Sequence, residues 1–527
     1  MEKIKARIAN QKARHTPADP DAQRSHREIM VIIFALMAAM LLAALDQTIV
    51  STALPKIASD LHGLNKLSWV ATAYLLTSAI VTPIYGKVSD SLGRKKVFQF
   101  AIIVFLIGSA LCGAAQNMDQ LVIFRAIQGL GGGGLISLAL ATIGDIVPPR
   151  QRGRYQGYFG AVFGVSSILG PLLGGLFTDH LSWRWIFYIN IPIGIVAFAA
   201  IALRLHLPVR SERHRFDVWG SLLMAGAVSC LLLALTWGGN TYAWGSGTIL
   251  GLFAGAIVLG AALIARERKA AEPIFPPRLF KNDIFIVSSL LSGLVGLVML
   301  GSIIFLPLYQ QIVRHDSPTI SGLLLLPFVA GLFSGSLTSG RLISKYGRYR
   351  HFPLIGNALL VLGLFLFSHI QTDTSQVVLS IWMIIMGLGI GLQMQVMTLA
   401  VQNSSDRKDL GTATSIVTFF RSLGSSIGTA VFGLILTSQL THYLTQAFAG
   451  SASQVSSAGL QSSSAAIQSL PPQVAQTVLQ SYTNAFQDVF LAAIPFAVAA
   501  FIVALFLREL PLHDTIKKEA GSGGAEI

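Results

Sequence analysis

Two charged residues, Asp46 and Arg125, lie inside long apolar stretches of the sequence. Asp46 is the only one of the 24 acidic residues that falls well inside such a stretch, IMVIIFALMAAMLLAALDQTIVSTAL. An ionised carboxylate in hydrocarbon costs roughly 2.5–3.5 kcal/mol on insertion scales unless it is paired, protonated or hydrated. A guanidinium at the same depth would offset this cost, and a weakened pairing would let the carboxylate take up a proton. The two residues are therefore candidates for a proton-binding ion pair.

The elements that must position this pair are membrane-spanning helices. The chain has 527 residues, of which 53% are hydrophobic and 12% charged, with a mean hydropathy of +0.64, and this excludes water-soluble globular classes. Long β-barrel alternation is absent, so we expect an all-α polytopic bundle. A spanning helix needs about 20 mostly apolar residues. Fourteen such stretches begin near Ile29, Leu67, Val97, Leu121, Tyr155, Trp185, Val218, Gly245, Ile284, Ile320, Phe352, Val377, Gly411 and Val489.

The distribution of lysine and arginine orients these spans. With both termini in the cytoplasm, 32 of the 38 basic residues fall in the tails and cytoplasmic loops. This is the bias that membrane proteins show, and it accounts for the net charge of +14 without nucleic-acid binding. Only Arg125 and Arg421 lie within spans. The four basic residues left on the outer side are Lys56, Lys66, Arg184 and Arg314.

Two cytoplasmic loops resemble each other, GKVSDSLGRKK at 86–96 and GRLISKYGRYR at 340–350. They predict two six-helix halves that are separated by two inserted helices, with a substrate site between the halves near the membrane midplane. The connection 441–487 contains no charged residue and is typical of a flexible extracytoplasmic segment or of loose helices. The expected units are a cytoplasmic tail 1–28, an N-terminal half 29–206, an insertion 207–282, a C-terminal half 283–508 that includes the connection 441–487, and a cytoplasmic tail 509–527.

Five motifs together resemble the major facilitator superfamily and, within it, the fourteen-span drug:proton antiporter branch. The resemblance implies the major facilitator fold and antiport that is driven by a proton gradient without a cofactor. The sequence departs from the pattern at Ser166, where the antiport motif often has glycine, and in the second loop, which lacks the acidic residue. The motifs are LDQTIVSTALPKI at 45–57, GKVSDSLGRKK at 86–96, RAIQGLGGGG at 125–134, GVSSILGPLLGG at 164–175 and WRWIFYINIPIG at 183–194.

Depth along the helices predicts that Asp46 and Arg125 meet. At 1.5 Å per residue, Asp46 lies about 5 Å and Arg125 about 6 Å from the outer edge of a core about 30 Å thick. In the family, the arginine at this position is implicated in proton transfer, so we expect proton coupling; a static ion pair is the alternative. Asp46 could also be the counter-ion of a cationic drug. The cavity candidates near it are Gln47, Thr48, Trp69 and Tyr74, for which ordinary packing is the alternative.

Asp90 and Arg94 stand four residues apart in the first repeated loop. They could pair with each other, with Asp145, or with the exposed amide groups at the start of the thirteenth span, 411–413. We interpret the loop as a conformational latch, with loop folding as the alternative. The latch residues are Gly86, Asp90, Gly93, Arg94 and Asp145.

The fifth span is dense in small residues and carries a kink-forming proline, which favours a hinge or a tightly sealed interface between the halves, or plain close packing. Arg421 lies near the midplane and could face the cavity and bind an anionic group, or hydrogen-bond backbone carbonyls, Gln393 or Gln395. The antiport-motif residues are Gly164, Gly170, Pro171, Gly174 and Gly175.

Enzyme chemistry is not expected. The stretch GLGGGG lies within a span, no Walker pattern occurs, and the histidines lack metal-ligand spacing. We predict a proton-coupled antiporter that exports amphipathic, cationic drugs across a bacterial cytoplasmic membrane. The alternatives are a dedicated exporter of an endogenous metabolite, lipid or siderophore, a proton-coupled uptake symporter and a non-transporting receptor. The expected partners are the substrate, protons and the lipid bilayer, with a monomer as the functional unit and a periplasmic adaptor protein as a further partner.

Overall fold

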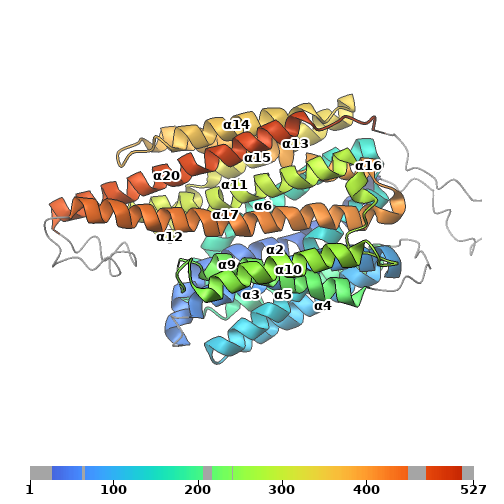
Figure 1. Cartoon of the computed structure of the whole chain (residues 1–527), viewed down its shortest axis with the longest axis horizontal. Helices are drawn as coiled ribbons and strands as arrows, with labels where there is room; N and C mark the ends of the chain where they lie inside the picture. The colour runs from blue at the N-terminus through green and yellow to red at the C-terminus, as the bar shows by residue number, and fades with distance from the viewer. Residues whose placement is uncertain (1–25, 62–65, 206–216, 240, 449–470, 513–527) are drawn as a thin grey trace, which may run out of the picture.

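The computed structural model describes residues 26–61, 66–205, 217–239, 241–448 and 471–512. In these ranges the regular secondary structure is helical, and the helices lie in two groups that meet along their lengths (Figure 1). The two expected terminal tails lie almost wholly outside the described residues, as does the middle of the connection 441–487.

In the described residues, the N-terminal group contains seven helices. The longest of them, α2 and α6, lie side by side and carry Asp46 and the antiport-motif glycines. The group comprises α2 (His26–Asp60), α3 (Leu67–Leu92), α4 (Arg94–Ala114), α5 (Met118–Ile146), α6 (Pro149–His180), α7 (Trp185–Tyr188) and α8 (Asn190–Arg204).

The C-terminal group contains more breaks, at α12 and between α15 and α16. It comprises α11 (Asp283–Ile312), α12 (Pro318–Leu323), α13 (Leu326–Tyr346), α14 (His351–Phe367), α15 (Gln376–Met394), α16 (Val396–Ser404), η3 (Arg407–Asp409), α17 (Leu410–Ala447) and α20 (Pro472–Leu505).

Two further helices, α9 (Val218–Trp237) and α10 (Gly247–Glu267), stand between the groups in the sequence, and the short helix η2 (Leu279–Lys281) follows them. Helix α9 contacts α3 of the first group and α17 of the second, and α10 packs on α9. Only 6% of the residues in the most apolar window of α10 are fully buried, so apart from its contact with α9 this helix lies at the periphery of the bundle, where we expect it to face lipid.

Thirteen helical segments in the described residues are long and apolar enough to cross a membrane. The apolar helix α14, with 17 residues, stands where the eleventh span is expected. The expected count of fourteen therefore corresponds to thirteen long segments and one shorter helix.

The last two helices are longer than the sequence predicts. Helix α17 continues to Ala447 and α20 begins at Pro472, so of the two alternatives for 441–487 the flexible segment is wrong at both ends, which are helical. Leu440 and Leu444 of α17 pack in one apolar cluster with Val478 and Phe486 of α20, and this burial stabilises helical turns that carry few charges. Figure 1 shows both helices projecting beyond the rest of the bundle.

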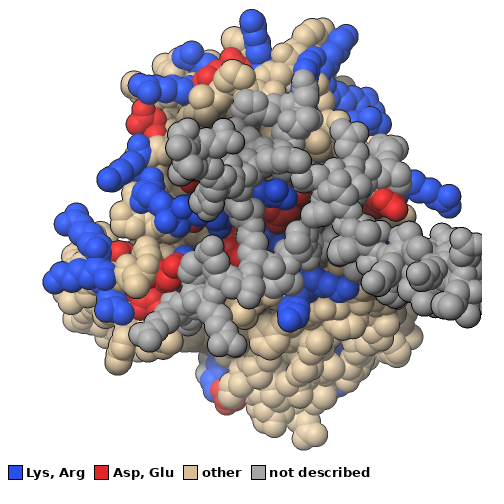
Figure 2. All heavy atoms as spheres, turned by 90° about the vertical axis from the view of Figure 1, so that its right-hand side faces the viewer, with Lys and Arg blue, Asp and Glu red and all other residues tan. Residues whose placement is uncertain are grey.

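The opposite end of the molecule carries the two repeated loops and is rich in lysine and arginine, as Figure 2 shows. We call this the basic end; it is the end that the charge distribution predicts to face the cytoplasm. The two loops share a backbone feature: Gly93 has φ of 91° and Gly347 has φ of 73°, values that favour glycine. Each glycine lets one helix end and the chain turn toward the next, but the two turns differ, since ψ is 138° at Gly93 and 9° at Gly347.

Candidate functional site

Asp46 and Arg125 form the ion pair that their depths predict. Arg125 Nη1 donates to Asp46 Oδ2 at 2.5 Å. Asp46 is 0% exposed and Arg125 is 2% exposed, so neither charge has more than marginal contact with water. Each partner therefore depends on the other, because a buried charge that loses its counter-ion is strongly destabilising.

Three polar residues that sequence reasoning missed complete this site. Gln128 Nε2 donates to Asp46 Oδ1 at 2.8 Å, while Gln128 Oε1 accepts from Arg125 Nη1 at 2.8 Å. Asn190 Nδ2 lies 3.4 Å from Asp46 Oδ1, and Ser109 Oγ accepts from both amides. Gln128 and Asn190 fall inside two of the motifs, RAIQGLGGGG and WRWIFYINIPIG, and this was the one signal that could have found them.

Arg125 is also held from its other side. Its guanidinium carbon lies 4.3 Å from the centre of the Tyr74 ring, and its Nε donates to the carbonyl oxygen of Val70 at 3.2 Å. Helix α3 thus supplies a cation–π contact and a backbone acceptor. A movement of α3 relative to α2 would change the environment of the ion pair directly.

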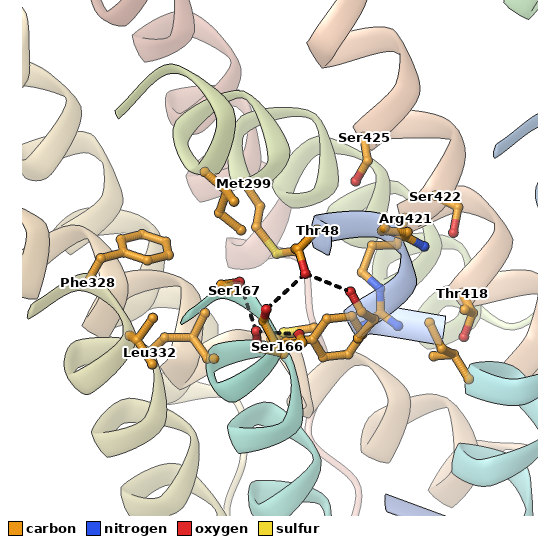
Figure 3. A pocket seen from close by; sticks show the side chains of 18 of the residues that line it. Thr48, Ser166, Ser167, Met299, Phe328, Leu332, Thr418, Arg421, Ser422 and Ser425 are labelled. Carbon is orange, nitrogen blue, oxygen red and sulfur yellow. Dashed lines mark hydrogen bonds between the residues drawn. The ribbon is translucent and has the colours of Figure 1, made fainter. Parts of the chain in front are cut away.

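Two neighbouring cavities that share lining residues lie between the halves. The outer one has a volume of about 570 Å³, and Arg125 and Tyr74 contribute to its wall. The inner one, about 120 Å³, is lined mainly by α2, α6, α11, α13 and α17, with one residue each from α3, α5 and α15. Gln47 and Thr48 line both cavities. Figure 3 shows the inner cavity, with Thr48 close to Ser166; the hydroxyl of Thr48 donates to the carbonyl oxygen of Ser166 at 2.8 Å.

Some of the predicted cavity residues are placed elsewhere. Trp69 lines neither of these two cavities; its ring packs edge-on against Trp237 of α9, with ring centres 5.3 Å apart. Gln393 also lines neither cavity, because it faces α14, where its side chain contacts Gly356. Asp46 itself is enclosed by Arg125, Gln128 and Asn190 and stands behind the cavity wall, so this arrangement offers a ligand no direct contact with its carboxylate.

Arg421 of α17 lines the inner cavity and is 8% exposed. Among the described residues it has neither an ion pair nor a hydrogen bond, including with Gln393 or Gln395, which the sequence offered as partners. Of the two alternatives that the sequence left open, the structure shows the cavity-facing arrangement.

At the basic end, Asp90 joins the two halves. The backbone N–H of Gly411 donates to Asp90 Oδ1 at 3.1 Å, and the backbone N–H and hydroxyl of Thr412 each donate to Oδ2 at 2.7 Å. Arg94 pairs with Asp90 at 2.5 Å and with Asp145 at 2.8 Å. Gly86 makes room for this junction, since a Cβ atom there would lie 2.5 Å from Ser415. All the contacts expected of the latch residues are thus present, and Gly93 supplies the turn.

The second repeated loop makes the corresponding junction on the other side of the bundle. Ser344, which aligns with Asp90, accepts from the backbone N–H of Arg154 in the first turns of α6 at 3.2 Å. Nearby, Gln156 Nε2 donates to Gln402 Oε1 at 3.1 Å. These contacts close the basic end between the halves. The outer cavity instead reaches Ser51 and Gln311, near the opposite ends of α2 and α11, so the bundle is hollow toward that end.

The antiport-motif residues of α6 serve two interfaces. Gly164 lies against Val329 of the other half, whereas Gly170 and Gly174 lie against Thr48 and Ile49 of α2. Pro171 contacts Gly322 of α12, and the carbonyl oxygen of Gly175 accepts from Thr178 at 3.0 Å. The first of these contacts seals the halves together, and the α2 contacts fix the helix that carries Asp46.

Two helical groups around a central cavity, with an ion pair buried beside it, define a polytopic membrane transporter. No cluster of three potential metal-ligating side chains occurs in the described ranges. The chain belongs to the Major Facilitator Superfamily, whose family model matches residues 36–429. The resemblance that the motifs indicate is thus confirmed for the superfamily.

Two relatives and one solved structure illustrate this membership. The chain is 43% identical to an uncharacterised MFS-type transporter of Mycobacterium tuberculosis (strain ATCC 25618 / H37Rv), over 92% of this chain and 70% of the relative. It is 37% identical to Multidrug resistance protein 3 of Bacillus subtilis (strain 168), over 92% of this chain and 96% of the relative. The proton:xylose symporter XylE superposes with a TM-score of 0.58 and 13% identity, over 90% of this chain and 96% of that one, which shows a common fold.

Proposed function

We propose that the protein is a proton-coupled antiporter that exports amphipathic small molecules across a bacterial cytoplasmic membrane. The observation that carries this proposal is the buried pair of Asp46 and Arg125 next to the cavity wall. Gln47 and Thr48, which line both cavities, directly follow Asp46 on the same helix. Occupation of the cavity and the protonation state of the carboxylate can therefore influence each other through one turn of α2.

The exchange follows from the hydrogen bonds of Asp46. With Arg125, Gln128 and Asn190 donating to it, the carboxylate is stabilised in its ionised form. When Arg125 turns toward the cavity that it lines, Asp46 loses its counter-ion and binds a proton from the extracytoplasmic side. Return of Arg125 after the halves rearrange releases this proton to the cytoplasm. The proton gradient then supplies the energy, and no cofactor is required.

Export, rather than uptake, is supported by the GVSSILGPLLGG motif of α6 and by the name of the Bacillus subtilis relative, Multidrug resistance protein 3. The fold cannot decide direction, since a proton:xylose symporter shares it. A dedicated exporter of one endogenous compound is the second candidate, because the inner cavity is small, about 120 Å³. The predicted preference for cationic drugs relied on direct contact with Asp46, and no acidic residue lines either cavity.

The setting proposed for this activity is a single chain in the lipid bilayer. Both halves and the cavity between them come from one polypeptide, so no second copy is needed to complete the site. A periplasmic adaptor protein would bind to α17 and α20, which project from the end opposite the basic end (Figure 1).

Gradient-driven accumulation of ethidium and fluorescein in inverted membrane vesicles tests the proposal. We expect accumulation of at least one dye in wild type, collapse with a protonophore, and loss in Asp46→Asn and Arg125→Ala. Asp119→Asn is the matched control, since Asp119 is an exposed acid on the same helix as Arg125. Accumulation in Asp46→Asn at the wild-type rate would refute the coupling role of the pair.

A further inference from the structure

Arg421 is distinct among the buried arginines of the described residues. Arg94 and Arg125 pair with carboxylates, and Arg152 donates to the carbonyl oxygens of Gly144, Val147 and Gln402. Arg421, in contrast, has no acceptor in the part of the chain that the structure describes, although it is 92% buried. Burial of an unpaired guanidinium is costly. A protein tolerates this free-energy cost where the buried charge is needed to bind a ligand.

The surroundings of Arg421 are polar on its own helix. Thr418, Ser422 and Ser425 of α17 line the same cavity, and Figure 3 shows Arg421 among them with Thr48 nearby. The hydroxyl groups of Thr418 and Ser425 donate to the carbonyl oxygens of Thr414 and Gly296, so each has a lone pair but no free O–H in this arrangement. The Ser422 hydroxyl makes no such bond in the described residues and can donate to an anion held beside the guanidinium.

The wall of the inner cavity that stands across from this polar group is largely apolar. Met299 of α11 and Phe328 and Leu332 of α13 stand across from the polar group, and Phe163 of α6 adds an aromatic side chain. The outer cavity has one charged lining residue, Arg125, whose charge Asp46 neutralises. The unbalanced charge that a ligand meets in these two cavities is therefore positive.

We propose that Arg421 binds the acidic group of the transported molecule, so that the substrates are amphipathic anions such as aromatic carboxylates, sulfonates or phenolates. The inference rests on the proposed export function and names the substrate class of the same cavity. The planar guanidinium can hold a carboxylate or sulfonate through two parallel hydrogen bonds, while the apolar wall receives the hydrophobic body. A cationic molecule of the same shape would meet repulsion from Arg421 and no carboxylate to offset it.

Equilibrium binding to the purified full-length protein in nanodiscs tests the proposal. The probes are fluorescein, an anion at pH 8, and rhodamine 123, a cation with the same xanthene framework. We expect wild type to bind fluorescein more tightly than rhodamine 123. Arg421→Met should weaken fluorescein binding at least about tenfold, Arg421→Lys should retain most of it, and rhodamine 123 binding should not weaken in either variant. Arg508→Met, which removes an exposed cation of the same half, is the control and should bind as wild type does.

The outcomes separate this inference from the export proposal. Binding needs no proton gradient, so loss of coupling in vesicles leaves the binding result intact, and a failure in binding leaves the Asp46 test intact. Equal fluorescein affinity in wild type and Arg421→Met overturns the inference, as does wild-type protein that binds only rhodamine 123 or neither probe. Folding is checked by melting temperature, which we expect to be unchanged or higher in Arg421→Met because a buried unpaired charge is removed.

Discussion

Thr412 donates both its backbone N–H and its hydroxyl to the same oxygen of Asp90, each at 2.7 Å. Asp90 belongs to the N-terminal half and Thr412 begins a long helix of the C-terminal half, so these bonds join the halves at the basic end. The carboxylate also neutralises Arg94, which in turn holds Asp145. One carboxylate thus binds Gly411 and Thr412 of one half and Arg94 of the other at the closed basic end.

We predict that Asp90→Ala opens the basic end. Hydrogen bonds to a charged group are worth roughly 1.5–3 kcal/mol each, so the equilibrium should shift at least about tenfold toward states open at this end. Spin labels at Leu92 and Lys408, both exposed at the basic end, would show by pulsed electron paramagnetic resonance a longer distance between the labels than in wild type. Ser344→Ala, at the aligned position, is the matched control and should have a smaller effect because its hydroxyl is uncharged. An unchanged distance distribution in Asp90→Ala would show that the junction does not hold the halves.

The buried pair gives a second prediction, on stability. Arg125→Met should lower the free energy of unfolding by about 3–5 kcal/mol, because Asp46 is left without its counter-ion. The double variant Asp46→Asn with Arg125→Met should recover most of this loss, since both charges are removed together. Thermal unfolding of the purified variants provides the comparison. If the double variant were no more stable than Arg125→Met, the pair would not be the dominant interaction at this site.

Asp46 and Arg125 show how far sequence alone reaches in this molecule. Depth in the membrane can be counted along a helix, and both residues lie at a similar depth, so their pairing was predictable. Rotation about the helix axis changes by 100° per residue, and only packing against neighbours fixes it. Gln128 and Asn190 were missed for this reason, and for Trp69 the sequence left cavity and packing open, of which the structure shows packing against α9.

The helices were predictable to within a few residues where apolar stretches end at charged loops. The ends of α17 and α20 were not predictable, because they continue as helices through sequence that is too polar for a membrane span. These ends are stabilised by packing against each other. Arg421 illustrates the remaining limit. The sequence shows a cation near the midplane, but only the arrangement of α2, α11 and α17 shows that it meets a cavity rather than a partner.

Close packing between α6 and α13 gives a third prediction. A Cβ atom at Gly160 would lie 2.5 Å from the hydroxyl oxygen of Ser336, so Gly160→Ala must push the two halves apart. We expect a severalfold lower transport rate in Gly160→Ala and recovery in the double variant with Ser336→Gly. Gly251→Ala on the lipid-facing helix α10 is the control, because nothing lies within 4 Å of the added atom. A double variant as slow as Gly160→Ala would place the defect elsewhere.

The projecting helices give the last prediction. Asp488 of α20 accepts hydrogen bonds from Gln439 at 2.7 Å and from the Tyr443 hydroxyl at 2.8 Å, both on α17. Asp488→Ala removes both bonds to a charged acceptor, so the local free energy of opening should fall by about 2–3 kcal/mol. Hydrogen exchange of the backbone amides at the end of α17 should then accelerate about thirtyfold or more, while amides near Arg421 keep their wild-type rates. The control is Gln473→Ala, a substitution at an exposed position of α20, which should leave the exchange rates unaltered. Equal exchange rates in wild type, Asp488→Ala and Gln473→Ala would mean that apolar packing alone holds α17 and α20 together.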